Sequence, residues 1–140
     1  MRMDFAEPED IRWILAQCRT WAVVGLADNP ARAAHGVARF LQQRGKRIVP
    51  VHPRAETVWG EDGYASLADV PFAVDCVDVF RRSEDAGAVA DEAIAIGAKA
   101  VWFQLGVVDD AAAARAAAAG LRVVQDRCPA IEWSALGPAA

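Results

Sequence analysis

The chain has 140 residues, of which 54% are hydrophobic and 24% charged, and this is the size and composition of one globular domain. Its formal net charge of −4 argues against a protein that binds nucleic acids or anionic membranes through its whole surface. The cysteines Cys18, Cys76 and Cys128 are widely spaced and form no CxxC pair, which favours free thiols in a reducing compartment over a thiolate zinc site. We therefore expect a single cytoplasmic domain over residues 1–140, with a core at about 10–133 and a short C-terminal tail.

Apolar periodicity divides the chain into alternating helices and strands. A first helix is predicted to begin at Pro8, because proline fits the first turn and the two acids that follow suit the helix dipole. Glycine or proline stands at the ends of several other elements. In chain order, the sequence predicts strands at 21–25, 47–51, 73–80, 100–103 and 121–124, and helices at 32–44, at 84–96 behind a Ser83 cap, and from an Asp109 cap to about residue 119.

This alternation predicts an α/β fold, a Rossmann-like arrangement of three layers in which helices cover both faces of a five-stranded parallel sheet. We predict the strand order 3-2-1-4-5, which places the reversal of the order between the first and fourth strands. Ligands of such folds bind in the crevice beyond the carboxyl ends of the strands at that point. The segments that follow the strands are therefore the candidate binding segments.

A short apolar strand ends at Gly25 and is followed by a small polar loop and a helix that begins near Arg32. The first N–H groups of a helix have no partners inside it, and the helix dipole adds partial positive charge there. A strand, a glycine and a helix in this order form a place where phosphate groups bind. Our hypothesis is a nucleotide whose phosphates lie on this loop, and an ordinary βα turn that binds nothing is the alternative.

Two features of the sequence point away from NAD. The loop has a single glycine, Gly25, in place of the G-x-G-x-x-G fingerprint. The second strand ends in His52-Pro53-Arg54, where an NAD site needs an acid for the ribose 2′-hydroxyl. An arginine there suits a phosphate on the ribose, and Arg32 at the helix start is a second candidate phosphate partner. The sequence thus favours a ligand with a phosphorylated ribose, such as NADP or coenzyme A (CoA).

Five short blocks of sequence follow one another in a specific order. They are Gly25-x-x-Asp28-x-Pro30-x-Arg32, Val49-Pro50-Val51-x-Pro53, Val77-Asp78-Val79-Phe80-Arg81, Trp102-x-Gln104-x-Gly106 and Asp126-Arg127-Cys128-Pro129-Ala130-Ile131-Glu132. Together they resemble the small stand-alone CoA-binding proteins of bacteria and archaea, over about residues 10–133. That family is similar in fold to the N-terminal domain of the succinyl-CoA synthetase α subunit.

The resemblance implies a Rossmann-like domain that holds CoA at the carboxyl ends of the strands. It implies that Arg32 and Arg54 face the phosphates of the ligand. His35, on the first turn of the helix, is a further candidate, with a capping or packing role as the alternative. The remaining implied contacts are Gly25, Leu26 and Ala27 along the phosphates and pantetheine, Val51, His52 and Pro53 at the adenine and ribose, Val79, Phe80 and Arg81 at the adenosine and pantetheine, and Gln104 and Gly106 at the far end.

Three positions depart from the family pattern. Ala27 and Ala34 stand where serine is usual, and His52 stands where asparagine or serine is usual. Each departure removes or alters one polar contact to the ligand, so we expect an affinity below that of the family.

The sequence predicts no catalytic residues and no metal site. The only histidines, His35 and His52, do not follow the fifth strand, as the phosphorylated histidine of an acyl-CoA synthetase of this type would. No Ser/His/Asp set and no cluster with metal-ligand spacing is present, and Asp75 and Asp78 are predicted to point to opposite faces of a strand. Cys128 is a candidate for a mixed disulfide with CoA, and a buried structural thiol is the alternative.

We therefore expect a non-catalytic module that binds CoA or an acyl-CoA, as a sensor or beside a partner enzyme. An NADP-binding oxidoreductase or redox sensor on the same fold is the second hypothesis, and an interaction domain with a vestigial pocket is the third. No nucleic acid or membrane partner is expected, and the oligomeric state is left open.

Overall fold

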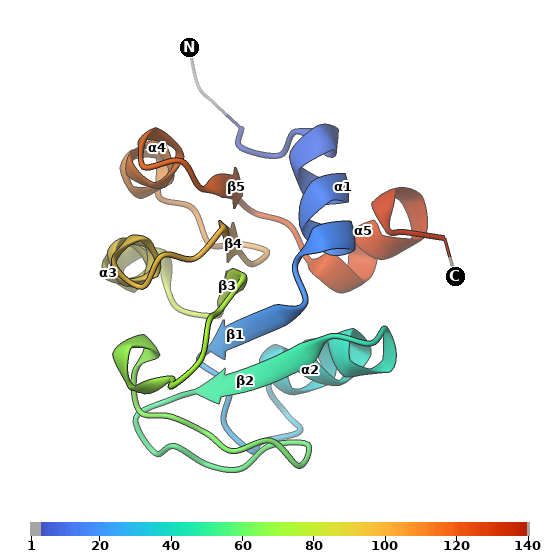
Figure 1. Cartoon of the computed structure of the whole chain (residues 1–140), viewed down its shortest axis with the longest axis vertical. Coiled ribbons are helices and arrows are strands. Elements are labelled where there is room, and N and C mark those ends of the chain that lie inside the picture. The colour runs from blue at the N-terminus through green and yellow to red at the C-terminus, as the bar shows by residue number, and fades with distance from the viewer. Residues whose placement is uncertain (1–3, 140) are drawn as a thin grey trace.

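One sheet of five parallel strands forms the centre of the protein in the computed structural model, which describes residues 4–139 (Figure 1). The strands are in close register, with Val24 paired to Val51 on one side and to Val79 on the other. The predicted class, a Rossmann-like α/β fold with a five-stranded parallel sheet, is confirmed. The strands are β1 (Thr20–Val24), β2 (Arg47–Val51), β3 (Cys76–Val79), β4 (Ala100–Phe103) and β5 (Arg122–Val124).

Five α-helices connect or flank these strands within the described residues. The Asp109 cap is confirmed, because its side chain accepts a hydrogen bond from the N–H of Ala112 at 3.0 Å. The segment after β5, which we expected as a tail, forms a further helix that begins with Pro129. The helices are α1 (Pro8–Gln17), α2 (Ala33–Gln43), α3 (Ser83–Ala95), α4 (Asp110–Ala118) and α5 (Pro129–Leu136).

The position of β3 in the sheet differs from the predicted order 3-2-1-4-5. The structure has the order β2-β1-β3-β4-β5, so β3 lies between β1 and β4 instead of beyond β2. The segment from β2 to β3 contains only the short 3₁₀ helix η1 (Leu67–Asp69), and Leu67 packs on the face of the sheet opposite α2. A right-handed crossover on that face runs back past β1. The order therefore reverses between β1 and β3, which moves the expected crevice to the ends of these two strands.

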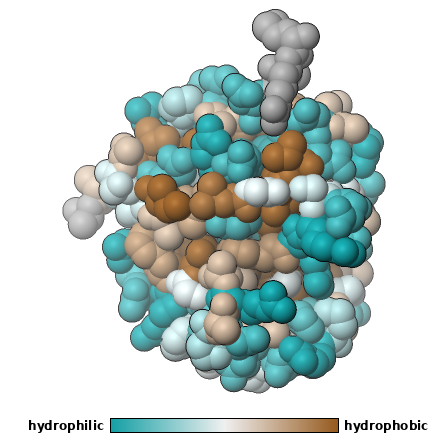
Figure 2. All heavy atoms as spheres, turned by 180° about the vertical axis from the view of Figure 1, so that it is seen from behind, coloured by the Kyte–Doolittle hydropathy of each residue, from teal (hydrophilic) through white to brown (hydrophobic). Residues whose placement is uncertain are grey.

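Each face of the sheet has its own hydrophobic core. Helices α3 and α4 cover one face with small alanine and valine side chains, and α1, α2 and α5 cover the other (Figure 1). The second core is built around Trp21 and Trp102, whose ring centroids lie 5.9 Å apart. From behind, Figure 2 shows apolar surface in a band across the middle of the molecule, with hydrophilic side chains above and below it.

One local prediction is wrong. Ser83 is the first residue of α3 and does not cap it; its hydroxyl group instead donates to the carbonyl of Gly106 and accepts from the N–H of Val108. In α2, Gly36 is exposed, and an added Cβ would meet no atom within 4 Å. The buried side of α2 is instead formed by Ala34, His35, Ala38 and Leu41.

Candidate functional site

The loop between β1 and α2 begins at Gly25, which has a φ of +104°. A Cβ at this position would collide with the backbone carbonyl of Phe80, the residue that follows β3. Glycine is thus required here both by the backbone conformation and by the close approach of two loops. As a result, the loop after β1 lies directly against the end of β3, at the point where the strand order reverses.

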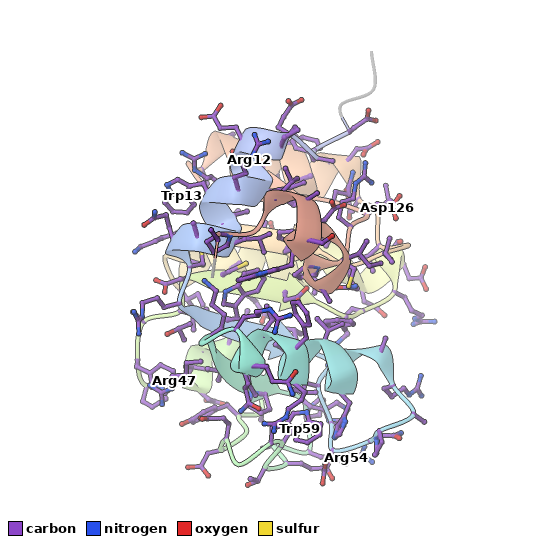
Figure 3. All side chains as sticks on the ribbon, turned by 90° about the vertical axis from the view of Figure 1, so that its right-hand side faces the viewer. Arg12, Trp13, Arg47, Arg54, Trp59 and Asp126 are labelled. Carbon is purple, nitrogen blue, oxygen red and sulfur yellow. The ribbon has the colours of Figure 1, made fainter. Side chains whose placement is uncertain are left out.

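A cavity of about 400 Å³ opens at the carboxyl ends of β1, β2 and β3, beside the first turn of α2. Figure 3 shows Arg54, one of its lining residues, on the same side of the molecule as Asp126, and shows Trp13 and Arg47 on the opposite side. The volume lies within the range of small-molecule sites. The lining consists of the predicted residues Gly25, Ala27, Arg32, His52, Arg54, Phe80 and Arg81, and of Asn29, Ala33 and Ala34.

Helix α2 begins in this cavity without a side-chain cap, since its N-cap residue is Arg32. The N–H groups of Ala33 and Ala34 form no hydrogen bond with another residue in the described range 4–139. Both alanines line the cavity. Unpaired N–H groups at the positive end of a helix dipole favour the binding of an anion.

Three arginines line the cavity, and two of them are free of acids. Within residues 4–139, Arg32 and Arg81 form no salt bridge with a carboxylate, whereas Nε of Arg54 lies 3.5 Å from Oε1 of Glu56. The side chain of Arg54 is 66% exposed. Because charge-assisted hydrogen bonds from arginine suit phosphate groups, the cavity can receive a ligand with several negative charges.

His52 lies at the end of β2, between these cations. Burial lowers the pKa of its imidazole, and the positive charges of Arg54 and Arg81 lower it further. Nδ1 of the ring accepts a hydrogen bond from the N–H of Arg54 at 3.1 Å, which requires this nitrogen to be unprotonated. The histidine is thus held in its neutral form at the cavity wall.

The loop after β2 is fixed to this strand by Tyr64. The N–H of Tyr64 donates to the carbonyl of Pro50 at 2.9 Å, and its carbonyl accepts from the N–H of His52 at 3.0 Å. Pro50 has no N–H of its own, which an edge strand such as β2 tolerates. This pairing holds the segment with His52 and Arg54 in place beside the cavity.

The other predicted contacts do not line the cavity. Leu26, Val51 and Val79 are buried in the two hydrophobic cores, and Pro53 is exposed beside His52. At the ends of β4 and β5, Gln104 is buried, and the N–H of Gly106 donates to Oδ1 of Asp126 at 2.7 Å. The predicted site residues that the structure brings together in the cavity are thus those that follow β1, β2 and β3 and lie at the start of α2.

His35 has a packing environment. Its Nε2 lies 3.2 Å from Oδ1 of Asp28, its ring centroid is 4.5 Å from that of Trp59, and its carbonyl accepts from Nε1 of Trp59. Arg39 stacks on Trp59 at 5.0 Å. These contacts support the packing alternative for His35, and they hold the loop that contains Trp59 against α2 (Figure 3).

Sequence reasoning missed an acid beside the site. The ribose-binding acid of an NAD site was sought at residues 52–54, directly after β2, and Glu56 lies just beyond them. Oε1 of Glu56 accepts a hydrogen bond from the N–H of Asp28 at 3.3 Å. The same oxygen lies 3.5 Å from Nε of Arg54. Spacing alone gave no signal for this contact, because it depends on how the loop after β2 turns back.

A buried carboxyl group lies on β3, on the face covered by α1, α2 and α5. Asp78 is fully buried, and neither of its oxygens has a hydrogen-bond partner among residues 4–139. Burial raises the pKa of this carboxyl group well above its usual range, which favours the neutral acid. Oε1 of Gln104, on the neighbouring strand end, is likewise buried without a partner among these residues.

The cysteines are buried and free. Burial raises the pKa of the Cys76 thiol well above its usual value, and the adjacent Cys18 raises it further, so the thiol form is favoured. Cys128 is the N-cap residue of α5 and is 6% exposed. Over residues 4–139, no group of three or more His, Cys, Asp or Glu side chains is placed to hold a metal ion, and no helix has the length and apolar character needed to cross a membrane.

Comparison with known proteins agrees with this geometry. Residues 19–134 match the model of a family described as CoA binding domain. The uncharacterized protein YneT of Bacillus subtilis is 36% identical over 119 residues, which are 85% of this chain and 88% of that protein. A hypothetical protein from Pyrococcus horikoshii is 35% identical, with a TM-score of 0.89 over 97% of this chain and 96% of its own.

A larger protein has the same fold in one of its parts. The dinucleotide-forming acetyl-coenzyme A synthetase 1 of Candidatus Korarchaeum cryptofilum matches 83% of this chain with a TM-score of 0.70, and the match covers 28% of the synthetase. At 22% identity, this likeness concerns the fold alone. The family match over most of the chain and the 36% identity to a protein of similar length show that this chain belongs to the CoA-binding domain family.

Proposed function

We propose that this protein binds CoA or an acyl-CoA in the cavity at the start of α2. The observation that supports this most strongly is that one cavity contains the N–H groups of Ala33 and Ala34 and the side chains of Arg32 and Arg81. Among residues 4–139, these N–H groups have no hydrogen-bond partner and these arginines have no acid partner. The diphosphate of CoA carries charge that these groups complement. Membership of the CoA-binding domain family supports CoA as the ligand.

Within this proposal, Arg54 receives the phosphate on the ribose. It lies beside His52 at the end of β2, the position at which dinucleotide-binding folds contact the ribose. The lone glycine of the β1–α2 loop leaves less free backbone around a diphosphate than the NAD fingerprint provides. Both features favour a ligand whose sugar has its own phosphate.

We further propose a binding or sensing role without chemistry of its own. Neither histidine follows β5, and His52 is held neutral with Nδ1 as a hydrogen-bond acceptor. The buried Asp78 carboxyl group lines no part of the cavity. The groups that do line it are suited to hold anions, and none is paired as a nucleophile with a base.

Thermal shift with three ligands tests the proposal. A ligand at about one hundred times its Kd adds roughly 2.7 kcal/mol to the free energy of unfolding, which raises Tm by several degrees for a chain of this size. We expect CoA to stabilise the protein more than 3′-dephospho-CoA or NADP does. Equal stabilisation by NADP would favour the oxidoreductase alternative, and no shift with any of the three would contradict nucleotide binding.

A further inference from the structure

A carboxylate lies beside Arg54, the residue proposed to hold the ribose phosphate. Oε1 of Glu56 is 3.3 Å from the backbone nitrogen of Asp28 and 3.5 Å from Nε of Arg54. Asp28 belongs to the β1–α2 loop, and Arg54 lines the cavity. One anionic side chain therefore bridges the two segments that are proposed to hold the phosphates.

The donors that Glu56 uses are of the kind that phosphate groups use. A loop backbone N–H and an arginine side chain both bind phosphate or carboxylate, because either anion offers charged acceptor oxygens. The carboxyl group of Asp28 itself is directed to His35, at 3.2 Å, so it does not compete for the same donors. Glu56 is the acid that occupies them.

The contact is also one that a ligand can displace. The side chain of Glu56 is 37% exposed and that of Arg54 is 66% exposed, and ion pairs of such exposure are weak. The backbone of Glu56 is held in place, because Gly63 packs directly on its carbonyl group. Displacement of the carboxylate therefore requires movement of the Glu56 side chain and not of this packed backbone.

We propose that Glu56 is a stand-in anion, which occupies Arg54 and the Asp28 N–H in the free protein and is displaced by the ribose phosphate of the ligand. This inference rests on the proposed function. It makes Glu56 a determinant of specificity, because a ligand must carry a phosphate at this position to compete with the carboxylate. It also predicts that loss of the negative charge strengthens binding, opposite to the effect of losing a contact residue.

The test compares Glu56→Gln with Glu84→Gln by titration calorimetry against CoA and 3′-dephospho-CoA. Glu84 is a matched control, because its Oε1 lies 3.1 Å from Nε of Arg82 and neither residue lines the cavity. Both variants lose one negative charge from an exposed glutamate–arginine pair. We expect Glu56→Gln to bind CoA about threefold to tenfold more tightly, with a smaller gain for 3′-dephospho-CoA and no gain in Glu84→Gln.

Four outcomes overturn the inference. Weaker binding of both ligands by Glu56→Gln would mean that the carboxylate accepts a hydrogen bond from the ribose and stays in the site. Unchanged binding would mean that Glu56 does not compete, and an equal gain in both variants would reflect overall charge only. If the unaltered protein binds neither ligand, the proposed function fails first, and this outcome is distinct from the other three.

Discussion

Two cavities of similar size lie at opposite ends of the sheet, and they differ in how their cations are paired. The cavity at the carboxyl ends has a volume of about 400 Å³, and the one at the amino ends, which includes Trp13, has about 480 Å³. At the amino ends, Lys99 lies 3.5 Å from Asp75, and Arg122 lies 3.0 Å from Asp10. Both cations of that cavity are neutralised, whereas Arg32 and Arg81 at the other end have no acid partner among the described residues.

The helix dipoles also place charge of opposite sign at the two cavities. Gly97 and Gly120, which line the amino-end cavity, follow the carboxyl ends of α3 and α4, where helix dipoles place negative charge. The carboxyl-end cavity receives the amino end of α2, where the dipole is positive. Cavity volume therefore does not distinguish the two ends, and unpaired positive charge does. An anionic ligand is expected at one end only.

The largest expected effect concerns two glycines with positive φ, one in each cavity. Gly25→Ala should lower the free energy of unfolding by about 2–5 kcal/mol, since it combines backbone strain with a collision against the Phe80 carbonyl. Gly97→Ala, at a φ of +73° with no atom within 4 Å of the added Cβ, should cost only about 1 kcal/mol. Urea unfolding of both variants measures the difference, and equal losses would contradict the close approach at Gly25.

The arginines of the two cavities are expected to differ in their effect on CoA binding. Arg32→Ala and Arg54→Ala should each weaken CoA binding by about 1.5–3 kcal/mol, roughly tenfold to more than one hundredfold, because each removes a charged donor to phosphate. Arg122→Ala removes the cation that pairs with Asp10 in the amino-end cavity. It should leave the affinity for CoA unchanged and affect only the free energy of unfolding. Titration calorimetry on the three variants decides the matter. A loss of affinity in Arg122→Ala would place the ligand at the other end.

A third prediction concerns the unpaired acid in the core between the two ends. The pKa of Asp78 is raised in the folded protein, so between about pH 3.9 and that pKa the folded state binds more protons than the unfolded state. Asp78 therefore lowers stability as pH rises, by up to about 1.4 kcal/mol per pH unit in this window. Asp78→Asn removes this dependence, so the variant should gain stability relative to the unaltered protein from about pH 4 upward. Unfolding midpoints at several pH values measure it, and a constant difference would show that Asp78 is ionised in the fold.

The smallest expected effect is a change in the pKa of His52, which lies at the wall of the carboxyl-end cavity. Burial lowers the pKa of His52, and the charges of Arg54 and Arg81 lower it further, so Arg54→Ala should raise that pKa. Bound CoA should raise it further, since phosphate adds negative charge nearby. An NMR titration of His52 in the unaltered protein, with and without CoA, and in Arg54→Ala follows both changes. A pKa of His52 that is insensitive to ligand would contradict phosphate binding beside it.

The local pattern of the chain was sufficient for the five strands, for the helices before β5 and for the cavity residues that follow β1 and β2. Apolar runs gave the strands, and Gly25, Arg32 and Arg54 were found from turn chemistry and charge. The position of β3 was not predictable in this way, because it depends on which face the helix-free segment after β2 crosses. Glu56 was missed for a similar reason, since its contact with Asp28 is made by a loop that turns back.

Some predicted contacts do not line the cavity although they belong to the motifs that resemble the family. Val51 and Val79 are the last residues of their strands, and Leu26 follows Gly25 in the loop after β1. They adjoin cavity residues in the sequence, but their side chains are buried in the cores. Helix α5 was expected as a tail, although Pro129 after the cysteine is a favourable first residue for a helix. The sequence pattern thus located the segments that line the cavity, while the orientation of each side chain depends on the fold.

A crystal structure of the protein grown with CoA would show whether the ligand lies in the carboxyl-end cavity. We expect the diphosphate within hydrogen-bond distance of the N–H groups of Ala33 and Ala34, with Arg32 beside it and the ribose phosphate at Arg54 in place of the Glu56 carboxylate. CoA bound in the amino-end cavity beside Trp13 and Arg122, or a carboxyl-end cavity that stays empty at saturating CoA, would contradict this expectation.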